Sequence, residues 1–226
     1  MQVRLRHPLA LFTIAALVLV GVAFAAGACE SDPTPSTGSP DSTPTTVGVE
    51  TYTDPDYGYS FEYPAGWVLK KSDPASVGGN GDAASTVQVG DPEGASVGGT
   101  GLDGLVVRVY ELDQEIDESM LPQVRPEVEG LIGDILSQNP SWEVDEDLTE
   151  TNVGGVPGFR ASFTFDWDAD HPVRTASYFL FDGTIEYELV VQAATENWET
   201  DQGVFAAFVA SFEPGPTSGD TTGATR

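Results

Sequence analysis

The sequence predicts an α+β fold in which helices cover an antiparallel β-sheet. Segments with alternating apolar residues follow one another closely, and the pair Asp182-Gly183 between two of them is typical of a β-hairpin turn. Residues 124–136 instead repeat their apolar side chains with helical spacing. Because the helical segments are few and do not alternate with the strands, antiparallel pairing is favoured over a parallel sheet.

The first half of the chain supplies three of the expected strands. Residues 59–63 alternate aromatic and polar side chains, which predicts a half-buried strand that ends at Pro64. The stretch 72–104 is rich in glycine and contains one short expected strand at 86–89. Residues 105–112 are apolar enough to predict a largely buried strand.

The strongest helical pattern comes next. Pro122 suits the first turn of a helix, and Asn139-Pro140 is expected to end it. The apolar stripe of this helix consists of Val124, Val128, Leu131, Ile132, Ile135 and Leu136.

The second half of the chain predicts consecutive strands with aromatic faces, followed by a short helix. Residues 142–153 are expected to add one strand in front of them. The final helix carries an apolar stripe around Phe205 and Phe208, with Asn197 or Thr200 as its N-cap. The three aromatic strands are expected at 159–167, 173–181 and 185–191.

Residues 1–29 have the layout of a bacterial lipoprotein signal. Arg4 and Arg6 precede an uncharged apolar run at 9–28, and small residues lead directly to Cys29. We expect cleavage before Cys29 and attachment of lipid to this residue. The alternative is an uncleaved transmembrane helix, because the apolar run is long enough to span a bilayer. Both hypotheses place the rest of the chain on the extracytoplasmic side of the cell membrane.

Three segments follow the predicted signal. Residues 30–46 consist almost entirely of Ser, Thr, Pro, Asp and Gly, and we expect a disordered tether. Residues 47–213 are enough for one well-packed domain. Residues 214–226 return to the composition of the tether and are expected to form a disordered tail.

The charge of the chain excludes some classes of function. Seven basic and 36 acidic residues follow Cys29, which gives the mature chain a net charge of −29, against −27 for the whole sequence. Such a charge repels phosphate groups, so we expect no nucleic-acid partner. Cys29 is the only cysteine and His171 the only histidine after the predicted signal, which excludes a disulfide or a multi-histidine metal site within one chain.

One acidic motif suggests calcium. Asp166, Asp168 and Asp170 alternate, as at the start of a calcium-binding loop. However, His171 stands where such a loop has glycine, and Ser177 stands where it has its closing glutamate. The competing interpretation is a polar turn between two strands. We therefore expect no resident cofactor, with Ca²⁺ bound by these three aspartates as the alternative.

Two further motifs fit enzyme families poorly. Residues 94–98 match G-x-S-x-G, with Ser96 as a nucleophile and His171 further along, which leaves a serine hydrolase as a remote hypothesis. Glycine-rich sequence surrounds this motif, whereas a nucleophile elbow joins a buried strand to a helix. Residues 99–104 match G-x-G-x-x-G but precede an expected strand rather than a helix, so no dinucleotide site is expected.

The chain resembles the PsbP-like domain family over roughly residues 51–212. The features that carry the resemblance are Tyr59-Ser60-Phe61-Glu62-Tyr63-Pro64 followed by Trp67, the helix at 124–138, Gly154-Gly155-Val156-Pro157-Gly158 before the aromatic strands, and the helix before Ser211-Phe212. The resemblance implies an α/β/α sandwich and a binding or supporting role beside a membrane complex, without catalysis. We therefore expect a lipid-anchored, non-enzymatic accessory protein with a protein partner at the outer face of the membrane.

Overall fold

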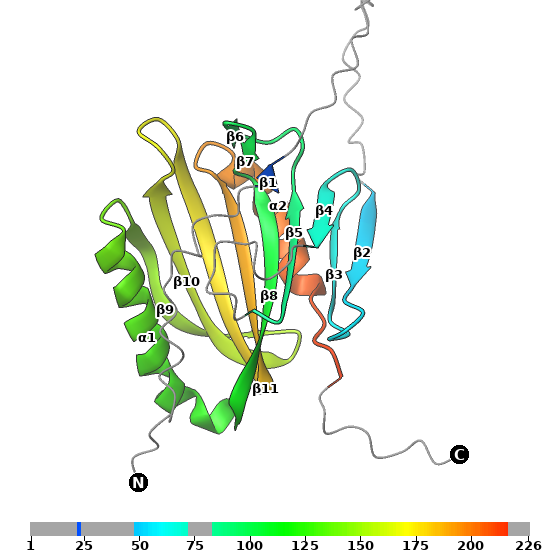
Figure 1. The fold of residues 1–226 in the computed structure, drawn as a ribbon, viewed down its shortest axis with the longest axis vertical. Helices are drawn as coiled ribbons and strands as arrows, with labels where there is room; N and C mark the ends of the chain where they lie inside the picture. Colours follow the sequence, from blue (N-terminus) through cyan, green and yellow to red (C-terminus); the bar gives the residue numbers. More distant parts are fainter. Residues whose placement is uncertain (1–21, 24–47, 72–82, 217–226) are drawn as a thin grey trace, which may run out of the picture.

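The computed structural model describes residues 22–23, 48–71 and 83–216. One antiparallel sheet dominates it, with the strand order β4-β5-β8-β11-β10-β9 (Figure 1). A separate two-stranded ribbon pairs β2 with β3, and a small sheet has the order β1-β7-β6. None of the helices in these ranges is both long and apolar enough to cross a membrane.

The elements follow one another in this order along the chain: β1 (Val22–Ala23), β2 (Val49–Thr53), β3 (Ser60–Pro64), β4 (Val68–Lys71), β5 (Ser85–Gly90), β6 (Ser96–Val97), β7 (Thr100–Gly101), β8 (Gly104–Ile116), a 3₁₀ turn (Glu118–Met120), α1 (Leu121–Gln138), β9 (Glu143–Val153), β10 (Val156–Asp166), β11 (Pro172–Ala194) and α2 (Trp198–Ser211).

The element β11 contains both arms of the expected hairpin. Its first arm, residues 172–181, pairs with β10, whereas its second arm, residues 184–194, pairs with β8. The two arms also lie against each other, because the N–H of Thr195 donates to the carbonyl of Pro172 at 2.9 Å. Gly183 has φ +64° at the tip, a conformation that costs glycine little. The hairpin predicted from Asp182-Gly183 is therefore confirmed.

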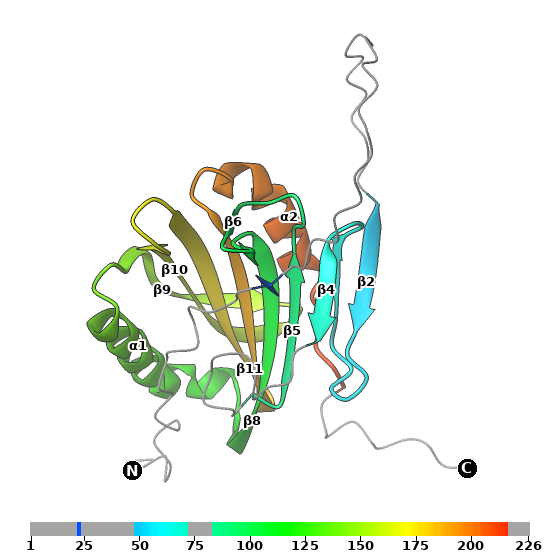
Figure 2. The same ribbon diagram turned by 45° about the horizontal axis from the view of Figure 1, so that its top comes forward.

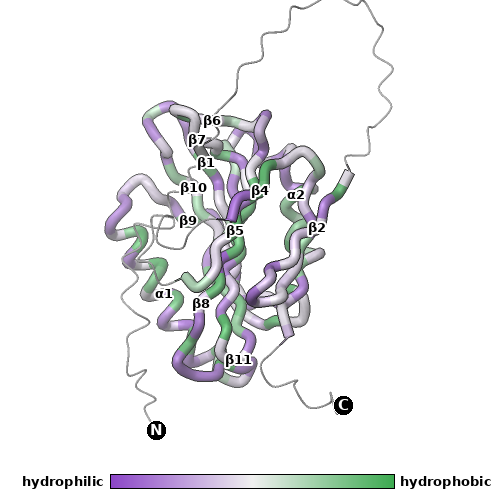
Figure 3. The backbone as a smooth tube through the Cα atoms, turned by 45° about the vertical axis from the view of Figure 1, so that its right-hand side comes forward, coloured by the Kyte–Doolittle hydropathy of each residue, from purple (hydrophilic) through white to green (hydrophobic). Residues whose placement is uncertain are grey.

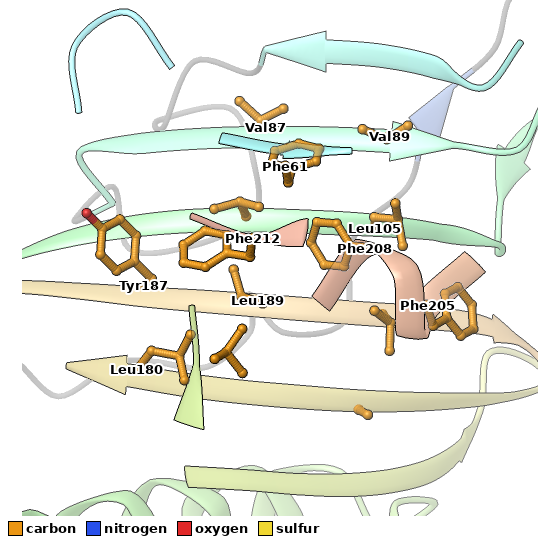
Figure 4. Packing of buried hydrophobic residues seen from close by; sticks show 14 of the residues in the cluster. Phe61, Val87, Val89, Leu105, Leu180, Tyr187, Leu189, Phe205, Phe208 and Phe212 are labelled. Atoms are coloured by element: carbon orange, nitrogen blue, oxygen red, sulfur yellow. The ribbon is translucent and has the colours of Figure 1, made fainter. Parts of the chain in front are cut away.

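One face of the sheet packs against α2 and the β2–β3 ribbon. The sequence placed Tyr59, Phe61 and Tyr63 on one face of the strand expected at 59–63. Tyr59, directly before β3, and Phe61 are almost fully buried there, and Tyr63 is half-buried against the same core. Phe61 meets Phe208 of α2 edge to face, with ring centroids 5.1 Å apart. Figure 4 shows this core, in which Phe208 and Phe212 face the side chains of β8 and β11.

The opposite face carries α1. The helix buries Val124, Val128, Ile132 and Ile135 against aromatic residues of β10 and of the first arm of β11. Trp142, just beyond the helix, stacks on Phe165 with ring centroids 4.4 Å apart. Figures 1 and 2 both show α1 at the β9–β10 end of the sheet, away from β5. The expected α+β fold, with helices on an antiparallel sheet, is therefore confirmed.

Some element boundaries differ from the sequence predictions. The strand expected at 105–112 continues to Ile116 as β8, and the strands β2 and β4 lie outside the expected ranges. Asn197 does precede α2, but its side chain makes no capping hydrogen bond and donates instead to Asp103 at 2.6 Å. That hydrogen bond uses the side-chain amide N–H of Asn197, whereas an N-cap residue accepts with its side-chain oxygen. Figure 3 shows that hydrophilic residues gather at the lower end of the sheet near β11.

Candidate binding site

A row of polar side chains crosses the α1-side face of the sheet over β5, β8 and the second arm of β11. All are buried except Tyr110, which is half-buried. Arg108 lies opposite Thr86 on one side and Glu188 on the other, and Tyr110 lies opposite Glu186. We call this set the polar strip, and it consists of Thr86, Gln88, Arg108, Tyr110, Glu186, Glu188 and Gln192.

The alternation of strand side chains creates the strip. Leu105, Val107 and Val109 of β8 point into the core beneath α2, as do Tyr187 and Leu189 of β11. Since successive strand residues face opposite sides, the residues between them must lie on the other face. Polar residues occupy most of those positions, in the middle of a sheet whose other buried positions are mostly apolar.

The centre of the strip is a buried ion pair. Nη1 of Arg108 lies 2.8 Å from Oε2 of Glu188, and each side chain is only 4% exposed. The hydroxyl of Tyr110 donates to the same oxygen at 3.3 Å. The other carboxylate oxygen of Glu188, Oε1, is buried, and no group of the described residues donates a hydrogen bond to it. One acceptor at the centre of the strip is therefore unsatisfied.

Glu186 is the second carboxyl of the strip. Burial and the neighbouring charge of Glu188 raise the pKa of Glu186 to about 8. Within the described residues no ion pair or hydrogen bond to its carboxyl is found. A pKa of this size means that the Glu186 carboxyl is mostly protonated and neutral at pH 7. The strip therefore holds one neutral acid beside one neutralised ion pair.

The other buried carboxylates of the domain are fully engaged. Asp54 accepts hydrogen bonds from the N–H groups of Asp56 and Tyr57 and from the hydroxyls of Tyr52 and Ser85. These bonds outweigh the effect of burial and lower the pKa of Asp54. Asp54 thereby ties the β2–β3 ribbon to β5.

Asp103 plays a similar structural part at the start of β8. It accepts from the N–H groups of Ala95 and Ala194 at 2.8 and 2.7 Å, and from the amide of Asn197. Two strands and the start of α2 are held together by this single carboxylate. The contrast with Asp54 and Asp103 distinguishes the polar strip, because buried carboxylates in folded proteins normally find donors.

The strip also lies outside both hydrophobic cores. Val106 and Val190, which lie between its polar members, are buried but belong to neither core cluster. Among the described elements, α1 packs on β10 and the first arm of β11, and α2 packs on the opposite face. The strip thus occupies the part of this face that α1 leaves uncovered.

One end of the strip reaches the small β6–β7 hairpin. The side-chain amide of Gln192 donates to the carbonyl of Leu102 at 3.0 Å, directly after β7. On β7, Gly101 and Thr100 pair antiparallel with Val22 and Ala23 of β1. The edge of β7 therefore accepts an extended segment next to the strip.

The three aspartates of the calcium hypothesis lie at the turn between β10 and β11. Asp166 ends β10, and Asp168 accepts from the N–H of Asp170 at 3.0 Å and contacts Nδ1 of His171 at 2.5 Å. These bonds with His171 and Asp170 lower the pKa of Asp168. No group of three potential metal ligands is found in residues 22–23, 48–71 and 83–216. The calcium site stays a prediction.

The residues of the hydrolase hypothesis lie in separate elements. Ser96 is in β6, which is followed by β7 rather than by a helix, so the context of a nucleophile elbow is missing. His171 lies in the β10–β11 turn, where its ring contacts Asp168. No hydrogen bond joins Ser96 to His171 in the described ranges. Cys29, the predicted lipid attachment site, lies outside the described residues.

A concavity with a volume of about 460 Å³ lies between α1 and the strands β9 and β10, apart from the polar strip. Arg125, whose guanidinium group binds the carbonyl of Leu148 and pairs with Glu129, contributes to its lining. Because Arg125 is already engaged, this cleft offers less unsatisfied polar capacity than the strip does.

Comparison with known proteins gives structural relatives only. No protein-family model matches the sequence, and no curated protein matches it either. The solution structure of cyanobacterial PsbP (CyanoP) from Synechocystis sp. PCC 6803 is similar with a TM-score of 0.51 at 15% identity, over 81% of this chain and 99% of that one.

Two further solved structures match with lower scores. LpqN of Mycobacterium tuberculosis, described as involved in cell envelope biogenesis, has a TM-score of 0.48 at 12% identity, over 76% of this chain and 93% of that one. The Ran-binding protein Mog1p of Saccharomyces cerevisiae has a TM-score of 0.40 at 14% identity, over 75% and 96%. The similarity to CyanoP, together with the helix-covered antiparallel sheet, shows that the chain has a PsbP-like fold.

Proposed function

We propose that the protein is a lipid-anchored extracytoplasmic accessory protein whose PsbP-like domain binds a partner through the polar strip, without catalysis. The observation that carries this proposal is the unsatisfied carboxylate oxygen of Glu188 in a buried strip that no described helix covers. A buried acceptor without a donor costs about 1–3 kcal/mol, so a strip kept only for stability would be replaced by apolar residues at little loss. A bound partner supplies the missing donor.

The predicted signal also bears on access to the strip. Cleavage before Cys29 would remove β1 from the edge of β7, beside the end of the strip marked by Gln192. The mature protein then presents an unpaired strand edge beside the strip to a partner. Strand edges of this kind bind extended segments of other proteins.

Partner binding is tested by mild cross-linking of native membranes followed by recovery of the protein. Glu186→Gln and Gln88→Leu alter the strip, and Glu115→Gln, an exposed position of β8, is the matched control. We expect a membrane partner that is recovered with the wild type and the control but lost with both strip variants. Recovery of the same proteins with all variants would contradict the proposal.

The anchor is tested separately by the intact mass of the protein extracted from membranes. Cleavage and lipidation predict a chain that starts at Cys29 and carries the added mass of the lipid. Cys29→Ser should abolish that modification and leave the precursor. An unmodified full-length mass in the wild type would instead support the uncleaved transmembrane helix.

A further inference from the structure

We propose that the group recognised by the polar strip is a positively charged nitrogen, an ammonium or guanidinium group, which binds between Glu186 and Glu188. This inference rests on the proposed binding function and names the chemistry of the ligand. It follows from the acceptors that the strip leaves without donors and from the charge of the chain.

The unpartnered oxygen at the centre of the strip is a hydrogen-bond acceptor. Oε1 of Glu188 is buried without a partner, while Oε2 is occupied by Arg108 and Tyr110. Glu186 follows on the same face, two residues earlier, since strand residues i and i+2 share a face. A ligand that donates hydrogen bonds satisfies Oε1 of Glu188 and, once Glu186 has lost its proton, the Glu186 carboxylate as well, whereas a ligand that only accepts hydrogen bonds leaves Oε1 of Glu188 without a partner.

The charges around the strip favour a cation over a neutral donor. The groups that face Glu186 are Glu188 on its own arm and Tyr110 and Arg108 on β8, while the first arm of β11 presents the apolar Phe181. Ionisation of Glu186 would give this set a net charge of −1, which a single cation neutralises. The net charge of −27 on the whole chain attracts cations and repels anions.

Binding of a cation must be coupled to release of a proton. Burial and Glu188 raise the pKa of Glu186 to about 8, so its carboxyl carries a proton at neutral pH. A bound cation favours the ionised form, and the proton leaves to solvent as the cation binds. The affinity therefore rises as the pH rises toward the pKa of Glu186.

The test uses mature protein extracted in a non-ionic detergent and calorimetric titration with two cationic probes. The probes are a tri-lysine peptide and spermidine, and the control is tri-lysine in which the α-amino group and all three side-chain amino groups are acetylated. Titration in two buffers of different ionisation enthalpy gives the number of protons released. Tighter binding of tri-lysine assigns the ligand to a protein segment, and tighter binding of spermidine assigns it to a free polyamine.

We expect Glu186→Gln to weaken binding of the preferred probe about tenfold, the loss of one charge-assisted hydrogen bond. The exposed control Glu115→Gln should change it by less than about twofold, because exposed charges contribute little. When the probe binds, the wild type should release a fraction of a proton at about pH 7, and this number should approach one below pH 7. Glu186→Gln should release none. Glu186→Gln replaces a neutral acid by a neutral amide of the same shape, so it should remain folded.

The inference is overturned if the acetylated peptide binds as well as tri-lysine, or if Glu115→Gln weakens binding as much as Glu186→Gln. The first result would show that binding does not need a cation. The second would show that the effect of Glu186→Gln comes from the overall charge of the chain. Loss of the membrane partner in the strip variants, without any binding of the cationic probes, would refute the ligand class and leave the proposed binding function standing.

Discussion

Replacement of Arg108 by methionine removes the cation from the buried pair while leaving its volume largely filled. In the wild type, Nη1 of Arg108 lies 2.8 Å from Oε2 of Glu188, and both side chains are only 4% exposed. Solvent therefore cannot replace the guanidinium group that the variant lacks. Breaking a buried pair on one side costs about 3–5 kcal/mol. For a domain of this size that corresponds to a fall in the unfolding midpoint of roughly 10 °C.

The cost of Arg108→Met should depend on pH. Without the guanidinium group, the ionised form of Glu188 is buried without a counter-charge, whereas the protonated form is neutral and carries no such cost. The stability that the variant loses is therefore greatest where carboxyl groups are ionised and is regained in acid. The destabilisation should therefore be small near about pH 4 and large near about pH 8.

The assay is urea unfolding at several pH values, followed by the fluorescence of the buried Trp142 and Trp198. The double variant Arg108→Met/Glu188→Met should recover most of the lost stability, because it removes the uncompensated charge. The reasoning is refuted if the double variant is as unstable as Arg108→Met, or if the cost of Arg108→Met is the same at every pH.

Four further results are expected. Glu186→Gln should make unfolding stability less dependent on pH between about 4.5 and 8, because the raised pKa of Glu186 makes wild-type stability fall across that range in urea titrations. Asp54→Ala should cost about 3 kcal/mol by urea unfolding and Asp54→Asn only about 1, because asparagine keeps an acceptor for two backbone N–H groups; equal costs would refute this. Gly158→Ala should lower the thermal midpoint by several degrees, about 2 kcal/mol or more, because its Cβ would collide with the carbonyl oxygen of Phe179. Calcium should shift the thermal midpoint no more than matched ionic strength does, because turn contacts already engage Asp168; a saturable rise that Asp168→Asn abolishes would establish a site.

Much of the fold follows from local patterns. The alternation around Phe61, the helical stripe of α1 and the turn at Gly183 each encode their element within a few residues. Boundaries were less predictable, because β8 extends to Ile116 through polar residues whose strand structure depends on pairing with β11. Long-range pairing, rather than local preference, decides such segments.

The polar strip was missed for a related reason. Arg108 and Glu188 are separated by 80 residues, and only the pairing of β8 with β11 brings them together. Glu186 and Glu188 alternate with apolar residues, a pattern that indicates a solvent-facing side. The available signal was Arg108 itself, a charged residue inside an otherwise apolar strand, which requires a buried partner.

The position of β9 at the end of the sheet bears on whether two copies of this protein can pair edge to edge. Its outer edge has no partner strand in the described sheet, and unpaired edges are templates on which another chain can add a strand. Glu143, Asp145, Glu146 and Asp147 are exposed positions of β9. Arg174 and Arg160 pair with Asp145 and Glu146, and the acidic charge that remains opposes the approach of the same strand of a second copy. The acidity of β9 thus acts against edge-to-edge self-association.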